Sequence, residues 1–109
     1  MKHIKTKTEF EKLWSGSQAL ICDFSATWCG PCKMLEPILE KLEKENPMIK
    51  FVKVDIDVHE ELSDQHKVQA VPTVFFVRKG KVIRRIVGVG GYGDLSREAK
   101  KLLADVKSR

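Results

Sequence analysis

Two cysteines lie three residues apart in the segment TWCGPCK, which runs from Thr27 to Lys33. Cys29 and Cys32 flank Gly30-Pro31, a dipeptide that favours a turn. Thiols at this spacing can supply half of a metal site, form a structural disulfide, or open and close as a redox pair. The surrounding residues favour one of these three chemistries.

A zinc site requires four protein ligands, or three and a water molecule, and cysteine and histidine are the usual ones. Beyond the pair, the chain has only Cys22 and three histidines, and it lacks a second CxxC or an HxxxH pattern. His59 and His66 are expected to be solvated, so we expect no bound metal. A structural disulfide over so short a loop would stabilise the fold by only about 2 kcal/mol.

A redox pair explains the neighbouring residues better. An apolar strand precedes the segment and a helix follows it, so Cys29 falls at a helix N-terminus, where unpaired N–H groups and the dipole favour thiolate. Pro31 suits the first helical turn, and Gly30 is expected to permit a tight turn between the sulfurs. Trp28 either shields the reactive thiol or belongs to the core.

Helices alternate with strands along the chain. Strands are expected at 19–24, 49–56, 73–77 and 81–87, the last two joined by a tight hairpin at 78–80, and a short polar helix at 58–66. Helices are expected after Thr8 as N-cap, from Gly30 to about Glu45, and near the C-terminus. The apolar stripes of the last two comprise Met34, Leu35, Ile38, Leu39 and Leu42, then Leu95, Ala99, Leu102, Leu103 and Val106. The order predicts one α/β domain over 1–109, a central mixed sheet flanked by helices on both faces.

The segment DFSATWCGPCKMLEPILEKL (23–42) resembles the active-site strand and helix of the thioredoxin family, and the resemblance extends over essentially the whole chain. The family also carries a proline at the position of Pro37, with a helix kink. Its dipeptide between the cysteines is Gly-Pro, whereas the more oxidising isomerases typically have Gly-His. The resemblance implies the thioredoxin fold and a protein-disulfide reductase that binds no cofactor and receives electrons from NADPH through thioredoxin reductase.

The resemblance also implies roles for individual residues. Cys29 would be the nucleophile, Cys32 the resolving cysteine and Asp23 its proton acceptor, with Lys53 balancing the charge of Asp23. The apolar neighbours of Asp23 predict burial and a raised pKa, although a solvated strand end is the alternative. Lys53 could equally be a surface lysine. Alternation along the strand directs Cys22 to the opposite sheet face as a buried, inert thiol.

A second loop is expected to hold the substrate. The segment AVPT (70–73) resembles the family's cis-proline loop, so Val71 and Pro72 would lie against the disulfide with Gly88 nearby. The motif GxGxxG at 88–93 lacks the following strand and acidic residue that dinucleotide binding requires. Three of its glycines depart from the family pattern, which puts the shape of the substrate groove in doubt: Gly90, Gly91 and Gly93.

Composition restricts the partners. The 109 residues carry a net charge of +5, but the basic residues are spread and no aromatic residues interleave with them, so nucleic acid is not an expected partner. The sequence predicts neither a membrane span nor a signal peptide. We expect a monomer in a reducing compartment, the cytoplasm or an organelle reached after processing. An isomerase-type oxidant and a binding subunit of a larger assembly are the alternatives.

Overall fold

Residues 1–107, the part of the chain that the computed structural model describes, contain five strands in one mixed sheet with the order β1-β3-β2-β4-β5. The parallel strands β1, β3 and β2 adjoin an antiparallel pair, β4 and β5. The strands are β1 (Lys2–His3), β2 (Leu20–Ser25), β3 (Lys50–Asp55), β4 (Thr73–Arg78) and β5 (Lys81–Val87). The helices are α1 (Lys7–Ser15), α2 (Gly30–Glu45), α3 (Glu60–Gln65) and α4 (Tyr92–Lys107).

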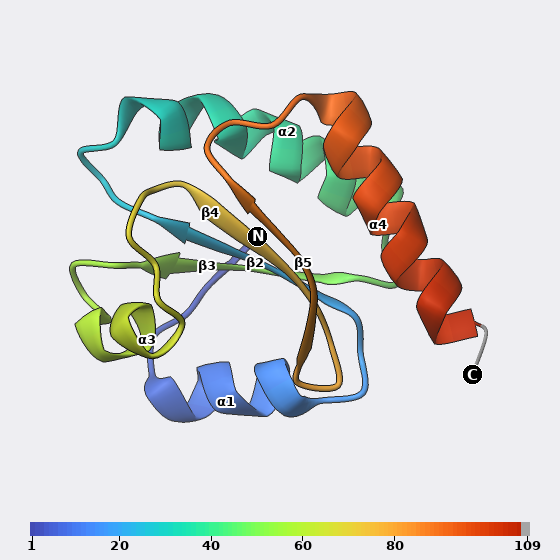
Figure 1. Ribbon diagram of the computed structural model, residues 1–109, viewed down its shortest axis with the longest axis horizontal. Helices are drawn as coiled ribbons and strands as arrows, with labels where there is room; N and C mark the ends of the chain where they lie inside the picture. Colours follow the sequence, from blue (N-terminus) through green and yellow to red (C-terminus); the bar gives the residue numbers. More distant parts are fainter. Residues whose placement is uncertain (108–109) are drawn as a thin grey trace.

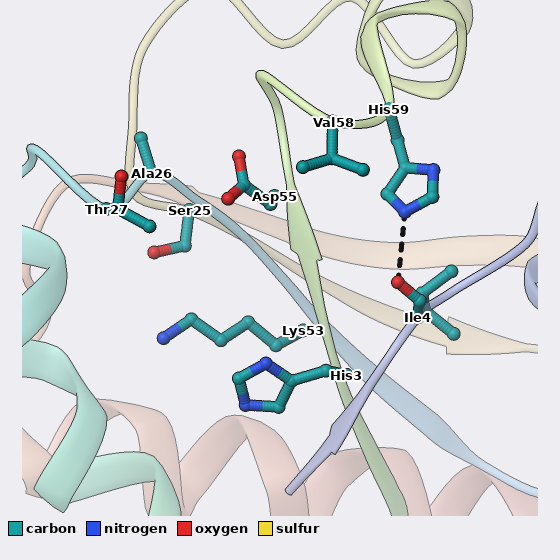
Figure 2. Close-up of a pocket in the computed structure, with 9 residues that line it drawn as sticks. All are labelled: His3, Ile4, Ser25, Ala26, Thr27, Lys53, Asp55, Val58 and His59. Atoms are coloured by element: carbon teal, nitrogen blue, oxygen red, sulfur yellow. Dashed lines mark hydrogen bonds between the residues drawn. The ribbon is translucent and has the colours of Figure 1, made fainter.

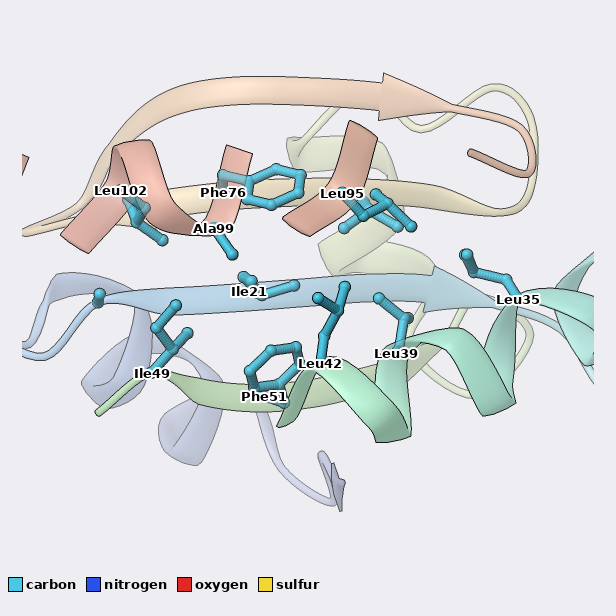
Figure 3. Close-up of a cluster of buried hydrophobic side chains, with 12 residues drawn as sticks. Ile21, Leu35, Leu39, Leu42, Ile49, Phe51, Phe76, Leu95, Ala99 and Leu102 are labelled. Carbon is cyan, nitrogen blue, oxygen red and sulfur yellow. The ribbon is translucent and has the colours of Figure 1, made fainter. Parts of the chain in front are cut away.

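Helices cover both faces of the sheet, as the sequence predicts. In Figure 1, α2 and α4 lie on one side of the strands, and α1 and α3 lie on the other. Alternate residues of β2, β3 and β4 therefore point into two separate cores. The core under α2 and α4 is drawn in Figure 3 and includes Ile21, Leu35, Leu39, Leu42, Phe51, Phe76, Leu95 and Leu102. The core under α1 and α3 includes Phe10, Cys22, Phe24, Val52, Val54, Leu62 and Phe75.

Helix α1 begins two residues earlier than the sequence predicts. Thr6, not Thr8, is the N-cap, because its side-chain oxygen accepts a hydrogen bond from the Glu9 backbone N–H at 3.1 Å. Both threonines precede the apolar residues of this helix, so periodicity alone does not distinguish them. Thr8 lies inside the first turn of α1.

The stripe predicted for α2 was wrong at one position, since the Met34 side chain is exposed. Pro37 lies inside α2, as expected. The hairpin at 78–80 is confirmed, with Lys79 and Gly80 both at positive φ, which suits a tight turn between antiparallel strands. Arg78 nevertheless belongs to β4 and is buried. The side chain of Val106 lies outside the described part of α4.

Strand β1 was missed because two residues are too short for a periodic pattern. Lys2 and His3 pair in parallel with Val52 and Lys53, which places β3 in the interior of the sheet. Lys53 is therefore not on a sheet edge.

Candidate redox site

The two cysteines lie where β2 leads into α2. Cys29 is the N-cap of α2, and its Sγ accepts a hydrogen bond from the Cys32 backbone N–H at 3.2 Å. The two residues form a disulfide, with their Cα atoms 5.3 Å apart. A sulfur that accepts an N–H bond at a helix N-terminus is stabilised as a thiolate when the disulfide opens. The strand–turn–helix context predicted for a redox pair is therefore present.

Neither cysteine is exposed, although the N-terminus of a helix after a turn suggests an accessible position for Cys29. In the disulfide form Cys29 is 4% exposed and Cys32 is 2% exposed. Both pack against Ala26, with Ile56 and Val71 beside them. The local sequence predicts the turn, but the loop that covers it comes from a distant part of the chain. The two cysteines therefore do not differ in their overall exposure.

The structure gives a reason for proline at position 31, between the cysteines, but none for glycine at position 30. Pro31 lies in the first turn of α2. Backbone N–H groups there have no intrahelical acceptor, so the missing N–H of proline costs no hydrogen bond. A Cβ atom added to Gly30 would meet nothing within 4 Å, and Gly30 is not at positive φ. Neither the available space nor the backbone conformation therefore requires glycine at this position.

Trp28 belongs to the surface beside the disulfide, not to the core. It is 66% exposed, and its indole Nε1–H donates to Asp57 Oδ2 at 2.8 Å. Asp57 follows β3, so this contact joins two loops at the same end of neighbouring parallel strands. The sequence analysis did not identify Asp57. The signal that could have identified Asp57 is its position directly after a predicted strand.

The loop at 70–73 lies against the disulfide. The Val71–Pro72 peptide bond is cis, as predicted. Cys29 Sγ is 3.7 Å from the Val71 carbonyl oxygen. The Pro72 carbonyl accepts a hydrogen bond from the Gly88 backbone N–H at 2.8 Å, and Gly88 has a φ of 88°. The structure therefore brings Cys29, Val71, Pro72 and Gly88 together.

The extra glycines do not all serve the site. Added Cβ atoms at Gly91 and Gly93 would meet nothing within 4 Å, and one at Gly90 would touch only side chains in ordinary contact. Gly93 already lies in α4. Only Gly88 among these glycines has a positive φ, so only there does the backbone itself favour glycine.

Asp23 is a buried carboxyl group beneath the disulfide helix. It is 1% exposed, and neither carboxyl oxygen has a hydrogen-bond partner among the described residues. Burial raises the pKa of Asp23 from 3.8 to about 7, while the nearby Lys53 ammonium opposes this rise and the Glu36 carboxylate adds to it. The prediction of a desolvated aspartate is confirmed, and the solvated strand end is not what the structure shows.

Lys53 lies directly beside Asp23 in the sheet. The two residues are register partners on the parallel strands β2 and β3. The Lys53 side chain is only 19% exposed, and its Nζ lies 3.4 Å from Glu36 Oε2 on α2. The alternative of a surface lysine was therefore wrong. Glu36 was missed because it lies outside the apolar stripe of α2, where a glutamate is ordinarily solvated.

A cavity of about 260 Å³ opens beside Lys53 at the carboxyl ends of β2 and β3. Figure 2 shows the Lys53 side chain crossing this cavity, with the His3 ring next to it and Asp55 and Ser25 on the opposite side. Thr27, one of the lining residues, belongs to the loop that leads to the disulfide. The cavity thus adjoins Lys53, the register partner of Asp23.

Two histidines are half-buried, and not fully solvated as the sequence had led us to expect. His59 Nε2 lies 3.0 Å from the Ile4 carbonyl oxygen, a contact drawn in Figure 2. His66 packs with its ring centroid 4.3 Å from that of Trp14. Burial, with Arg85 nearby, lowers the pKa of His66. Both histidines are therefore half-buried, one at each end of α3.

Cys22 lies on the opposite sheet face from Asp23 and is 0% exposed, as predicted. Burial, assisted by the Asp23 charge, raises the pKa of the Cys22 thiol well above its usual range. A buried thiol of this kind is a poor nucleophile.

Among the residues described, no helix is both long enough and apolar enough to cross a membrane.

Comparison with known proteins identifies the family. The Thioredoxin family model matches residues 1–101. The thioredoxin of Mycoplasmoides gallisepticum is 41% identical over 88 residues, which are 81% of this chain and 88% of that protein. Thioredoxin-1 of Saccharomyces cerevisiae is 37% identical over 84 residues, 77% of this chain and 82% of that protein.

Solved structures agree with the sequence relatives. Oxidised mitochondrial thioredoxin 3 of Saccharomyces cerevisiae superposes with a TM-score of 0.84 and 36% identity, covering 93% of this chain and 94% of that chain. The thioredoxin of Trypanosoma brucei brucei has a TM-score of 0.87 and 30% identity, covering 94% of this chain and 89% of that chain. A disulfide lies at the start of α2, and a cis-proline loop lies against it. These features and the relatives together show that the chain belongs to the thioredoxin family.

Proposed function

We propose that this protein carries electrons from NADPH, through thioredoxin reductase, to disulfides in target proteins. The thiol–disulfide oxidoreductase activity itself follows from the family and from the Cys29–Cys32 pair. The observation that supports the proposal most strongly is the position of Cys29 Sγ, between the N-terminus of α2 and the Val71 carbonyl. A disulfide at this position can be opened by a reductase and re-formed at the expense of a target.

The reaction begins with the reduced pair. The Cys29 thiolate attacks one sulfur of a target disulfide, and the other target sulfur leaves as a thiolate that takes up a proton. The helix dipole contributes about 0.3–1 kcal/mol to the thiolate, and the Cys32 N–H bond adds to it. The backbone of the Val71–Pro72 loop, next to the sulfur, is placed to align an extended target segment.

Resolution requires a second thiolate. In the proposed step, Asp23 accepts the proton of Cys32, and the Cys32 thiolate then attacks Cys29 Sγ and releases the second target thiolate. Two electrons have passed to the target, and the Cys29–Cys32 disulfide is restored. With its pKa raised to about 7, Asp23 is suited to exchange a proton near neutral pH. Lys53 would balance the charge that Asp23 acquires.

The proposed partners are thioredoxin reductase and proteins that carry accessible disulfides, and the chain is proposed to act as a monomer in a reducing compartment. Similar thioredoxins include a mitochondrial protein of yeast, so an organelle and the cytoplasm both fit. The reducing direction is proposed because the active-site dipeptide is Gly-Pro.

The test is a coupled assay with purified protein, thioredoxin reductase, NADPH and insulin. We expect oxidation of NADPH that depends on this protein and on insulin, together with precipitation of the reduced insulin chains. The Cys29→Ser variant should show neither. Failure of the wild-type protein to accept electrons from reductases of bacterial and eukaryotic type would contradict the proposal. A reduction potential near that of disulfide isomerases would instead indicate an oxidant.

A further inference from the structure

The cation nearest to the buried carboxyl group is paired with a different carboxylate. Lys53 and Asp23 are register partners on adjacent interior strands, so their side chains project to the same face of the sheet. Lys53 Nζ nevertheless lies 3.4 Å from Glu36 Oε2, while both oxygens of Asp23 have no hydrogen-bond partner among the described residues. Glu36 on α2 therefore competes with Asp23 for a single ammonium group.

We infer that Glu36 is a positioning residue for proton transfer: by holding the Lys53 ammonium at the rim of the site, it keeps the Asp23 carboxyl group protonated at higher pH. The Glu36 side chain is 37% exposed, so water stabilises its charge in a way that it cannot stabilise the charge of Asp23. Glu36 is thus the carboxylate that holds the ammonium group at the rim of the site.

The other charged groups around this pair are few. His3 on β1 is the register partner of Lys53 on its other side, and Asp55 lies two residues further along β3. Both line the cavity that Lys53 crosses in Figure 2. Cys32, in the first turn of α2, is the group proposed to exchange a proton in the reduced protein, and the β4 register partner of Asp23 is the uncharged Val74. Among these groups, Glu36 is the one in ion-pair contact with Lys53.

Removal of the Glu36 charge should therefore favour ionised Asp23 in two ways. One negative charge near the carboxyl group is lost, and the Lys53 ammonium is released to approach Asp23. Both effects act in the same direction and lower the proton affinity of Asp23. The consequence for the rate of resolution rests on the proposed role of Asp23 as proton acceptor, whereas the effect on its titration does not.

The direct test is titration of the Asp23 carboxyl carbon by ¹³C NMR in the oxidised proteins. We expect the midpoint in Glu36→Gln to fall by on the order of half a pH unit relative to wild type, the scale for one partly screened charge. The matched control is Glu40→Gln, which removes the same charge one turn further along α2. Glu40 is exposed and forms no ion pair among the described residues. Its midpoint should match wild type.

Two further measurements separate the alternatives. In a Lys53→Met background, Glu36→Gln should shift the midpoint less, because the ammonium group that Glu36 retains is gone. In the kinetic test, the pH profile for decay of a mixed disulfide should move to lower pH in Glu36→Gln. If the NMR midpoint falls and the kinetic profile does not follow it, the effect of Glu36 on the titration of Asp23 stands, whereas the proposed role of Asp23 as proton acceptor fails.

An unchanged NMR midpoint in Glu36→Gln would overturn the inference, as would equal falls in Glu36→Gln and Glu40→Gln. A shift that keeps its full size in the Lys53→Met background would overturn the route through Lys53.

Discussion

Replacement of Asp23 by asparagine should stabilise the folded protein, and increasingly so as the pH rises. The carboxyl group is buried with no hydrogen-bond partner in the described residues, so its ionised form is strongly disfavoured by burial. Asparagine has nearly the same shape and carries no charge. The substitution therefore removes the penalty of ionisation and keeps the packing under α2.

The magnitude follows from linkage between protonation and folding. The pKa of Asp23 rises from 3.8 in its ordinary state to about 7 in the folded protein. Between these two values the unfolded chain has lost its proton and the folded chain keeps it, so wild-type stability falls as the pH increases. At about 1.4 kcal/mol for each pKa unit, the total loss is about 4 kcal/mol, complete just above pH 7.

Denaturant melts of the oxidised proteins at a series of pH values from about 4 to 8.5 measure this effect. We expect wild type and Asp23→Asn to be similar near pH 4 and the difference to approach about 4 kcal/mol at pH 8. The control is Asp64→Asn, which changes an exposed aspartate on α3 and should give a difference that does not grow with pH. A constant difference for Asp23→Asn, or a loss of stability above pH 7, would refute the reasoning.

Three further predictions concern local features. In the reduced protein, Cys29 should be alkylated faster than Cys32, because its sulfur is the helix N-cap beside the Val71–Pro72 loop; equal rates would contradict this assignment. Thr6→Ala should lower the free energy of unfolding by about 1 kcal/mol through loss of the α1 cap, whereas Thr8→Ala should change it little; equal losses in denaturant melts would argue against Thr6 as the cap. Gly88→Ala should cost about 1–2 kcal/mol, since alanine is strained at a φ of 88°, and an unchanged melt would show that the loop relaxes.

The features that the sequence predicted well depend on neighbouring residues. The bounds of α2 follow from the Gly-Pro dipeptide at its start and from a periodic apolar stripe. Burial of Asp23 follows from apolar neighbours within one strand, because a strand with buried residues on both faces lies inside the sheet. The assignment of Cys29 and Cys32 as a redox pair needed only their spacing and the strand–turn–helix order around them.

The features that the sequence did not predict depend on contacts between distant segments. The low exposure of Cys29 results from packing by the loop that contains Val71. The Trp28–Asp57 hydrogen bond and the Lys53–Glu36 ion pair each join residues on different elements. Neither pair has a local signature, since a carboxylate on a helix surface or after a strand is ordinarily solvated. Only the spatial arrangement shows which of these charges act on the site.

The central claim is that Cys29 attacks the target and Cys32 resolves the intermediate. The most direct test is to incubate reduced Cys32→Ser protein with a disulfide-containing peptide and to map the trapped adduct by mass spectrometry. The account predicts a stable mixed disulfide on Cys29, which wild-type protein does not accumulate. An adduct on Cys22, or no adduct with Cys32→Ser under conditions in which wild-type protein reduces the peptide, would contradict it.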